Sequence, residues 1–145
     1  MNWFQKEILL HSKKRGFVLI TNDILKQLPE ILKYDIGRLD LFIKHTSASL
    51  TINENSDPTV REDLESHFNH NVPENSEFYQ HTFDGPDDMP AHIKSTIIGN
   101  NITITITNGK LNLGTWQGIY LCEHRYQAHT RKIVATINGK INQSY

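Results

Sequence analysis

The sequence has few cysteines, no excess of positive charge and no long apolar run, which are features that disulfide-bonded, nucleic-acid-binding and membrane proteins require. It contains one cysteine, so no disulfide can form within the chain, which is typical of proteins from a reducing compartment. Fifteen Lys and Arg residues against 16 Asp and Glu leave a net charge of −1, which argues against a basic surface for nucleic acid. The longest apolar runs, such as Ile8–Leu10 and Phe17–Ile20, are too short to cross a membrane. We therefore expect a cytoplasmic protein with neither a nucleic-acid nor a membrane partner.

What the sequence does contain is enough chain for one domain and many histidines. A chain of 145 residues can bury about 70% of its unfolded surface, so we expect a single domain over residues 1–145. Eight imidazoles in so small a chain are the strongest functional signal in the composition.

Alternating apolar residues predict that strands dominate the fold. Strands are expected over residues 3–12, 17–20, 38–44, 48–53, 101–107, 110–113, 118–125 and 131–138. The first two read as a hairpin across a polar turn that ends in Gly16, and Asn108-Gly109 predicts another hairpin. Because most strands follow one another through tight turns, we expect an α+β fold with a mostly antiparallel sheet.

Two or three helices are expected to pack on this sheet. An apolar stripe after the second strand predicts a helix that Pro29 shortens. Asp57-Pro58 predicts a helix start, because the carboxylate caps free N–H groups and proline loses no hydrogen bond there. Apolar residues at four-residue spacing over 89–97 predict a third helix. The long polar loop before it, residues 71–88, favours a functional role, as loops of this length often have one.

Three histidines occupy positions where chemistry is plausible. His45 follows a strand on its core side, His92 lies beside the apolar stripe of a helix, and His124 ends a strand within a Glu-His-Arg run. Each also has a plain interpretation, respectively a buried residue ending a strand, a helix-surface residue and a charged strand end. No two of them share a local metal-binding spacing, so only the fold can bring them together. Three imidazoles around an open fourth position suit a catalytic zinc or a similar ion.

Other candidates have weaker signals. Cys122 lies mid-strand among apolar residues, which favours a buried structural thiol over a nucleophile. Trp116 is flanked by glycines, which fits either a ligand approaching the backbone or a tight turn with the indole filling the core. His67 and His70, three residues apart on a helix, fit a polar helix surface better than a metal pair.

Three motifs occur in a recognisable order and spacing. They are His45–Asn55, Asp87–Ser95 and Gly114–Arg125, and the turn Lys13–Phe17 and the helix start Asp57–Arg61 belong to the same pattern, which spans nearly the whole chain. Together they resemble the bacterial YjbQ-like family, whose members are commonly labelled secondary thiamine-phosphate synthases because some show a weak activity of that kind. The resemblance implies a compact α+β fold with a large mixed sheet, a homotrimer, and a pocket near the subunit boundary lined by the three motifs.

Each motif contributes one histidine, so the resemblance implies that His45, His92 and His124 share a site for a metal ion or an anion. Three imidazoles suit zinc, nickel or iron, whereas magnesium would suit a synthase. The five other histidines lie outside the motifs and keep the plain interpretation.

Thiamine-phosphate synthesis joins a pyrimidine diphosphate to a thiazole phosphate and displaces pyrophosphate, so the diphosphate must be polarised. Arg125 can take a phosphate through its forked guanidinium, with the hydroxyls of Thr46 and Ser47 nearby. We therefore expect an enzyme for a small phosphorylated molecule or anion, either a synthase-like transferase or a metal-assisted hydrolase or phosphate-handling enzyme. The alternative is a non-catalytic homotrimer that binds a metal ion or an anion.

Overall fold

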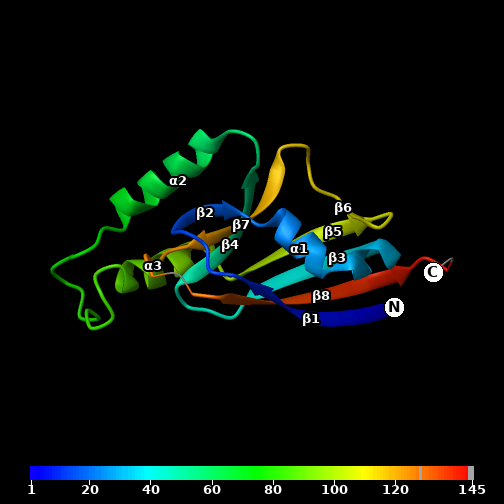
Figure 1. The fold of residues 1–145 in the computed structure, drawn as a ribbon, viewed down its shortest axis with the longest axis horizontal. Helices are drawn as coiled ribbons and strands as arrows, with labels where there is room; N and C mark the ends of the chain where they lie inside the picture. The colour runs from blue at the N-terminus through cyan, green and yellow to red at the C-terminus, as the bar shows by residue number, and fades with distance from the viewer. Residues whose placement is uncertain (128, 144–145) are drawn as a thin grey trace.

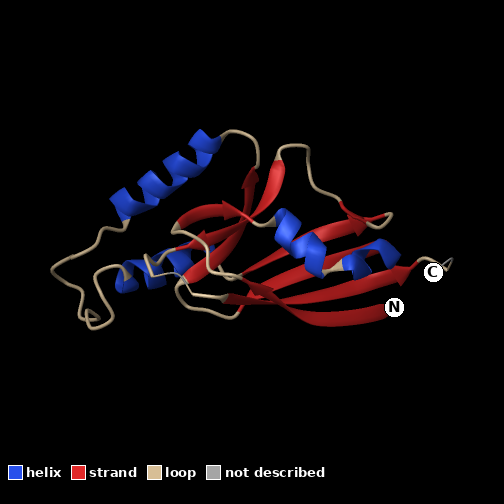
Figure 2. Ribbon diagram, in the orientation of Figure 1, coloured by secondary structure: helices blue, strands red, loops and turns tan. Residues whose placement is uncertain are grey.

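The computed structural model describes residues 1–127 and 129–143, whose strands form two antiparallel sheets (Figures 1 and 2). The five-stranded sheet contains, in order, β1 (Asn2–Leu10), β8 (Arg131–Ile141), β3 (Tyr34–Ile43), β5 (Asn101–Thr107) and β6 (Lys110–Leu111). The three-stranded sheet contains β2 (Gly16–Leu19), β7 (Gln117–Glu123) and β4 (Ala48–Glu54). The α+β class is confirmed, and the strands divide between two sheets in place of one large one.

The prediction that the first two strands form a hairpin is wrong. β1 pairs with β8 along its whole length, whereas β2 pairs with β7 in the other sheet. Each strand finds a partner distant in sequence because its apolar side chains face the core there, as Ile8 and Leu10 do from β1. The segment between them carries the chain from one sheet to the other, and Arg15 ties it to Glu65 and Glu74 at 3.3 Å.

Local chemistry accounts for the end of α1 and the start of α2. α1 (Thr21–Gln27) stops before Pro29, which opens the short 3-10 helix η1 (Pro29–Lys33). α2 (Pro58–Asn71) begins after Asp57, whose carboxylate accepts the N–H of Thr59 at 2.9 Å. α3 (Asp88–Ile98) follows the long loop and packs beside β4, while α2 packs beside β2 (Figure 1).

The main core lies under the five-stranded sheet, where Leu39, Leu41 and Ile43 of β3 are fully buried, as their alternation predicts. A smaller cluster beneath α2 includes Cys122, and burial raises the pKa of its thiol to about 12. Cys122 is therefore the inert buried thiol that the sequence predicts. Trp116 is 63% exposed, so the interpretation that its indole fills the core is wrong.

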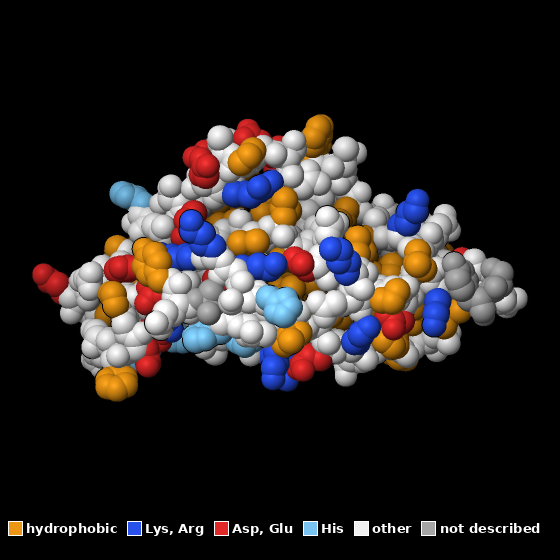
Figure 3. Space-filling model, in the orientation of Figure 1, with side chains coloured by type: hydrophobic (Ala, Val, Ile, Leu, Met, Phe, Trp, Pro, Cys, Tyr) orange, Lys and Arg blue, Asp and Glu red, His pale blue; other side chains and the backbone are white. Residues whose placement is uncertain are grey.

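Acidic and basic side chains are interspersed on the face shown in Figure 3, with no single basic patch there. None of the described helices is both long and apolar enough to span a membrane.

Candidate functional site

Three side chains meet where the long loop joins α3. His81 comes from the loop, Asp88 is the first residue of α3, and His92 follows one helical turn later. The Nε2 atoms of His81 and His92 lie 2.7 and 3.0 Å from Oδ2 of Asp88, and one ligand atom from each residue lies within 4.8 Å of the others. Two imidazoles and a carboxylate at this spacing can hold a divalent transition metal. We call these residues the His81–Asp88–His92 cluster.

His92 is oriented for metal binding by the backbone. Its Nδ1 lies 3.0 Å from the carbonyl oxygen of Thr46. Because a carbonyl oxygen only accepts hydrogen bonds, Nδ1 must carry a proton, so Nε2 is the ring atom that faces Asp88 and would bind a metal ion. Fixing the tautomer of a ligand through its other ring nitrogen is the usual arrangement around protein-bound metals.

Arg125 holds the carboxylate of Asp88 in place. Its Nη1 donates to Oδ1 of Asp88, its Nε donates to Asp87 at 3.0 Å, and its Nη2 donates to the carbonyl oxygen of Asp84 at 2.8 Å. The guanidinium predicted to hold phosphate therefore already has three protein acceptors. It fixes the carboxylate of Asp88 so that Oδ2 faces the two histidines.

The carboxylate of Asp88 is ionised despite being buried. Burial alone would raise its pKa, but hydrogen bonds from His81 and His92 and the nearby charge of Arg125 outweigh that effect. The pKa of Asp88 therefore lies below its ordinary value, which keeps the anionic form that a metal ion requires.

His45 and His92 share one pocket. This cavity of about 520 Å³ is lined by His45, Thr46, His92, Ser95, Thr96, Gly99 and Asn100, and we call it the histidine pocket. Because His92 belongs both to this pocket and to the cluster, a molecule bound in the pocket would lie beside the cluster.

His124 lies apart from the histidine pocket. It is buried, and its Nε2 lies 2.7 Å from the hydroxyl of Ser49. Burial lowers the pKa of His124 to about 3, so the ring is neutral. The structure thus brings two of the three motif histidines to one pocket, and a metal site shared by all three stays a prediction.

Ser47 is also buried, and its hydroxyl accepts a hydrogen bond from Arg131 at 3.1 Å. Arg131 in turn forms a fully buried ion pair with Glu123. Of the three predicted phosphate contacts, only Thr46 lines the histidine pocket.

The sequence reasoning missed His81 and the role of Asp88. The two signals that could have found them were the length of the loop over residues 71–88 and the one-turn spacing of Asp88 and His92 on α3. The length of the loop favours a functional role but does not say which of its residues carries that role. Nothing local links His81 to the helix, because the loop must fold back before its side chain reaches Asp88.

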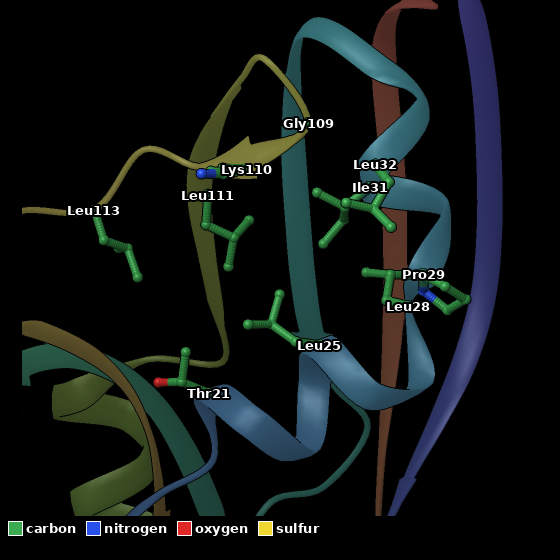
Figure 4. Close-up of a pocket in the computed structure, with 10 residues that line it drawn as sticks. All are labelled: Thr21, Leu25, Leu28, Pro29, Ile31, Leu32, Gly109, Lys110, Leu111 and Leu113. Carbon is green, nitrogen blue, oxygen red and sulfur yellow. The ribbon is translucent and has the colours of Figure 1, made fainter. Parts of the chain in front are cut away.

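A second cavity, of about 500 Å³, lies between the α1–η1 segment and the β5–β6 hairpin (Figure 4). Leucine side chains from both segments face this space, among them Leu25, Leu32 and Leu111, and we call it the leucine cavity. Its described lining has no carboxylate, imidazole or thiol, so it lacks the usual ligands for a metal ion, and Lys110 is its one charged residue.

Comparison with known proteins agrees with the motifs. The family model described as "UPF0047 protein YjbQ-like" matches residues 6–140. The chain belongs to this family. It is 49% identical over 138 residues to the UPF0047 protein YjbQ of Escherichia coli O157:H7, which covers 95% of this chain and 99% of the relative. The Salmonella typhimurium protein of the same name is 50% identical over 138 residues, with the same shares covered.

Two solved structures share the fold. A YjbQ/UPF0047 protein from Clostridium acetobutylicum, 37% identical, superposes with a TM-score of 0.77 over 89% of this chain and 97% of that one. A hypothetical protein from Aeropyrum pernix, 23% identical, gives a TM-score of 0.81 over 94% of this chain and 99% of that one. The names of these relatives and structures assign no reaction, so function must be argued from the site.

Proposed function

We propose that the chain is a metal-dependent enzyme that hydrolyses a small polar molecule. The observation that carries the proposal is the His81–Asp88–His92 cluster beside the histidine pocket. A bound ion such as zinc would supply Lewis-acid polarisation and a coordinated water of lowered pKa. A pocket that shares a residue with a metal site is where a substrate would meet that ion.

The chain's own residues divide the remaining tasks. The carbonyl oxygen of Thr46 holds the His92 ring in its tautomer, and Arg125 holds the carboxylate of Asp88. The histidine pocket would bind the substrate. These groups are preorganised by neighbours, so they need no large rearrangement when the substrate binds.

A weak thiamine-phosphate synthase activity, with magnesium, is a second candidate for the same pocket. The family resemblance and the position of Thr46 in the pocket wall support it. Arg125 and Ser47 would then have to exchange their present partners for phosphate, since their polar atoms are engaged by Asp87, Asp88 and Arg131.

We also propose that the protein assembles as a homotrimer in the cytoplasm. The leucine cavity supports an assembly, because Leu25 is 40% exposed and Leu32 is 58% exposed beside it. Exposed apolar side chains around a concavity are typical of surfaces that another chain covers. The free thiol of Cys122 is compatible with a reducing compartment.

The experiment that tests the enzyme proposal compares turnover with and without metal. Protein loaded in turn with zinc, manganese or magnesium is assayed on 4-nitrophenyl acetate, 4-nitrophenyl phosphate and the pair of thiamine precursors. We expect metal-dependent hydrolysis that Asp88→Asn lowers at least about tenfold, as loss of a metal ligand should. Asp63→Asn, an exposed carboxylate on α2, is the matched control and should leave turnover unchanged. Stoichiometric metal without turnover of any substrate would favour the non-catalytic homotrimer instead.

A further inference from the structure

His45 is held in one tautomer by the backbone of β8. The N–H of Lys132 donates to Nε2 of His45 at 2.9 Å, so the proton of the neutral ring lies on Nδ1. Burial, with the nearby positive charges of Arg131 and Lys132, lowers the pKa of His45, which keeps the ring neutral near pH 7. Within the described residues Nδ1 has no hydrogen-bond partner, and the ring lines the histidine pocket. His45 thus has a fixed donor whose acceptor is not part of the described chain.

The described wall of the histidine pocket is polar and contains no permanently charged side chain. None of the described residues that line it is Lys, Arg, Asp or Glu. The hydroxyl of Ser95 donates to the carbonyl oxygen of Ala48 at 3.1 Å, and that of Thr96 donates to the carbonyl oxygen of His92 at 2.8 Å. Both hydroxyl protons are used, so these side chains offer lone pairs only. The wall therefore suits an uncharged ligand whose N–H or O–H groups bind these acceptors, and a counter-charge for an ionised ligand would have to come from the metal ion of the cluster.

We infer that the histidine pocket binds an uncharged amide or ester, and that Nδ1–H of His45 is the catalytic hydrogen bond donor to its carbonyl oxygen. The inference rests on the proposed function and names its substrate class and a further residue that contacts substrate. Water adds to the carbonyl carbon, the bond from that carbon to the leaving nitrogen or oxygen breaks, and the leaving group takes a proton from that water. The oxygen becomes more negative as water adds, so a fixed donor aimed at it lowers the barrier.

Replacing His45 by glutamine or by asparagine distinguishes a hydrogen bond donor to the ligand from a residue with only a structural role. In His45→Gln the side-chain oxygen can replace Nε2 as acceptor for Lys132, but nothing replaces the donor at Nδ1. In His45→Asn the amide nitrogen lies near the position of Nδ1, but the contact with Lys132 is lost. A residue with only a structural role should tolerate His45→Gln better, whereas a donor to the ligand should tolerate His45→Asn better.

The probe is acetamide, an uncharged amide, titrated into cobalt(II)-loaded protein and followed by the visible spectrum of cobalt. We expect His45→Gln to raise the Kd about tenfold, the value of one hydrogen bond to a polarised oxygen, and His45→Asn to stay within about threefold of the parent protein. Both variants should keep the cobalt content of the parent. Inorganic phosphate, titrated in parallel, should bind more weakly than acetamide.

Each other outcome overturns the inference in a distinguishable way. An unchanged Kd in His45→Gln would remove the donor role, and loss of cobalt from that variant would make His45 a metal ligand instead. Phosphate binding more tightly than acetamide would remove the substrate class while leaving the metal site intact. A parent protein that takes up no cobalt would remove the proposed function itself, and this inference with it.

Discussion

Ser49, Cys122 and His124 form a small buried polar group between β4 and the end of β7. The hydroxyl of Ser49 lies 2.7 Å from Nε2 of His124 and also forms a hydrogen bond with the thiol of Cys122. Buried polar groups are tolerated when they satisfy one another, and this arrangement keeps the imidazole of His124 neutral. His124 therefore contributes to stability through its protonation state.

The pKa of His124 predicts a pH dependence of stability. It falls from 6.5 to about 3 because of burial, so the unfolded chain binds a proton that the folded chain does not between these values. The stability that the neutral ring of His124 contributes is fully present above pH 6.5, and it is lost as the pH falls from 6.5 toward about 3. Between pH 7 and pH 5 this amounts to about 2 kcal/mol of the free energy of unfolding.

Urea unfolding at pH 7 and pH 5 measures this effect. We expect the parent protein to lose more stability than His124→Gln by about 2 kcal/mol, since glutamine can keep the contact with Ser49 but does not titrate. Equal losses in the two proteins would show that His124 is not held neutral by the fold.

At the scale of residues, the sequence predicted which side chains have useful chemistry better than it predicted which groups those side chains contact. His45, His92 and His124 lie in the motifs, yet only the fold shows that His124 is engaged by Ser49 and that His92 faces Asp88. His81 escaped notice because its role depends on the path of the loop over residues 71–88, which no periodicity encodes. Side-chain chemistry can be read from sequence, whereas convergence is a property of the folded chain.

At the scale of elements, the Glu123–Arg131 ion pair joins the ends of two strands in different sheets. Arg131 of β8 also donates to the carbonyl oxygen and hydroxyl of Ser47, and Glu123 of β7 accepts the backbone N–H of Arg125. One buried pair thus positions both the segment before β4, which holds His92, and the residue that holds Asp88. The positions of His92 and Asp88 therefore both depend on the Glu123–Arg131 ion pair.

Breaking this pair is expected to be costly. Arg131→Met leaves the carboxylate of Glu123 buried without its partner, which should lower the free energy of unfolding by about 3–5 kcal/mol. Lys44→Met removes the exposed pair with Glu7 and is the matched control, with an expected loss below about 1 kcal/mol. The free energies come from urea unfolding followed by circular dichroism. Similar losses in the two variants would argue against a structural role for the buried pair.

Local signals predicted the elements but not which strands pair. Asn108 and Gly109 have φ values of 50° and 74°, which fit the tight turn that their sequence predicts between β5 and β6. Gly109 is also needed for space, because a Cβ there would lie 2.9 Å from the carbonyl oxygen of Leu32. In contrast, the polar turn after β1 predicted a hairpin that does not form, because pairing is decided by distant strands that bury the same apolar face.

At the scale of the whole molecule, the histidine pocket and the leucine cavity have different chemical character. The first offers imidazoles and hydroxyls, whereas the second offers leucines. This difference supports a division of labour in which one surface carries the chemistry and the other contacts neighbouring chains.

The proposed assembly can be tested by placing a charge at the leucine cavity. Leu32→Glu should convert a trimer to monomers, because burying an unpaired carboxylate in an apolar interface is unfavourable. Since Leu32 is 58% exposed in the single chain, the monomer should remain folded. Phe78→Glu, an exposed aromatic residue of the long loop, is the control and should leave the mass unchanged. Light scattering during size-exclusion chromatography gives the masses, and an unchanged trimer in Leu32→Glu would contradict this use of the cavity.

The account depends most on whether the His81–Asp88–His92 cluster binds a metal ion. The direct measurement is the metal content of dialysed, zinc-exposed protein by mass spectrometry. We predict one ion per chain in the parent and in Asp63→Asn, and at least about a tenfold lower affinity in Asp88→Asn and His81→Ala. His81 is exposed, so its removal should not unfold the chain. A full equivalent of zinc in both cluster variants, or none in the parent protein, would contradict the account.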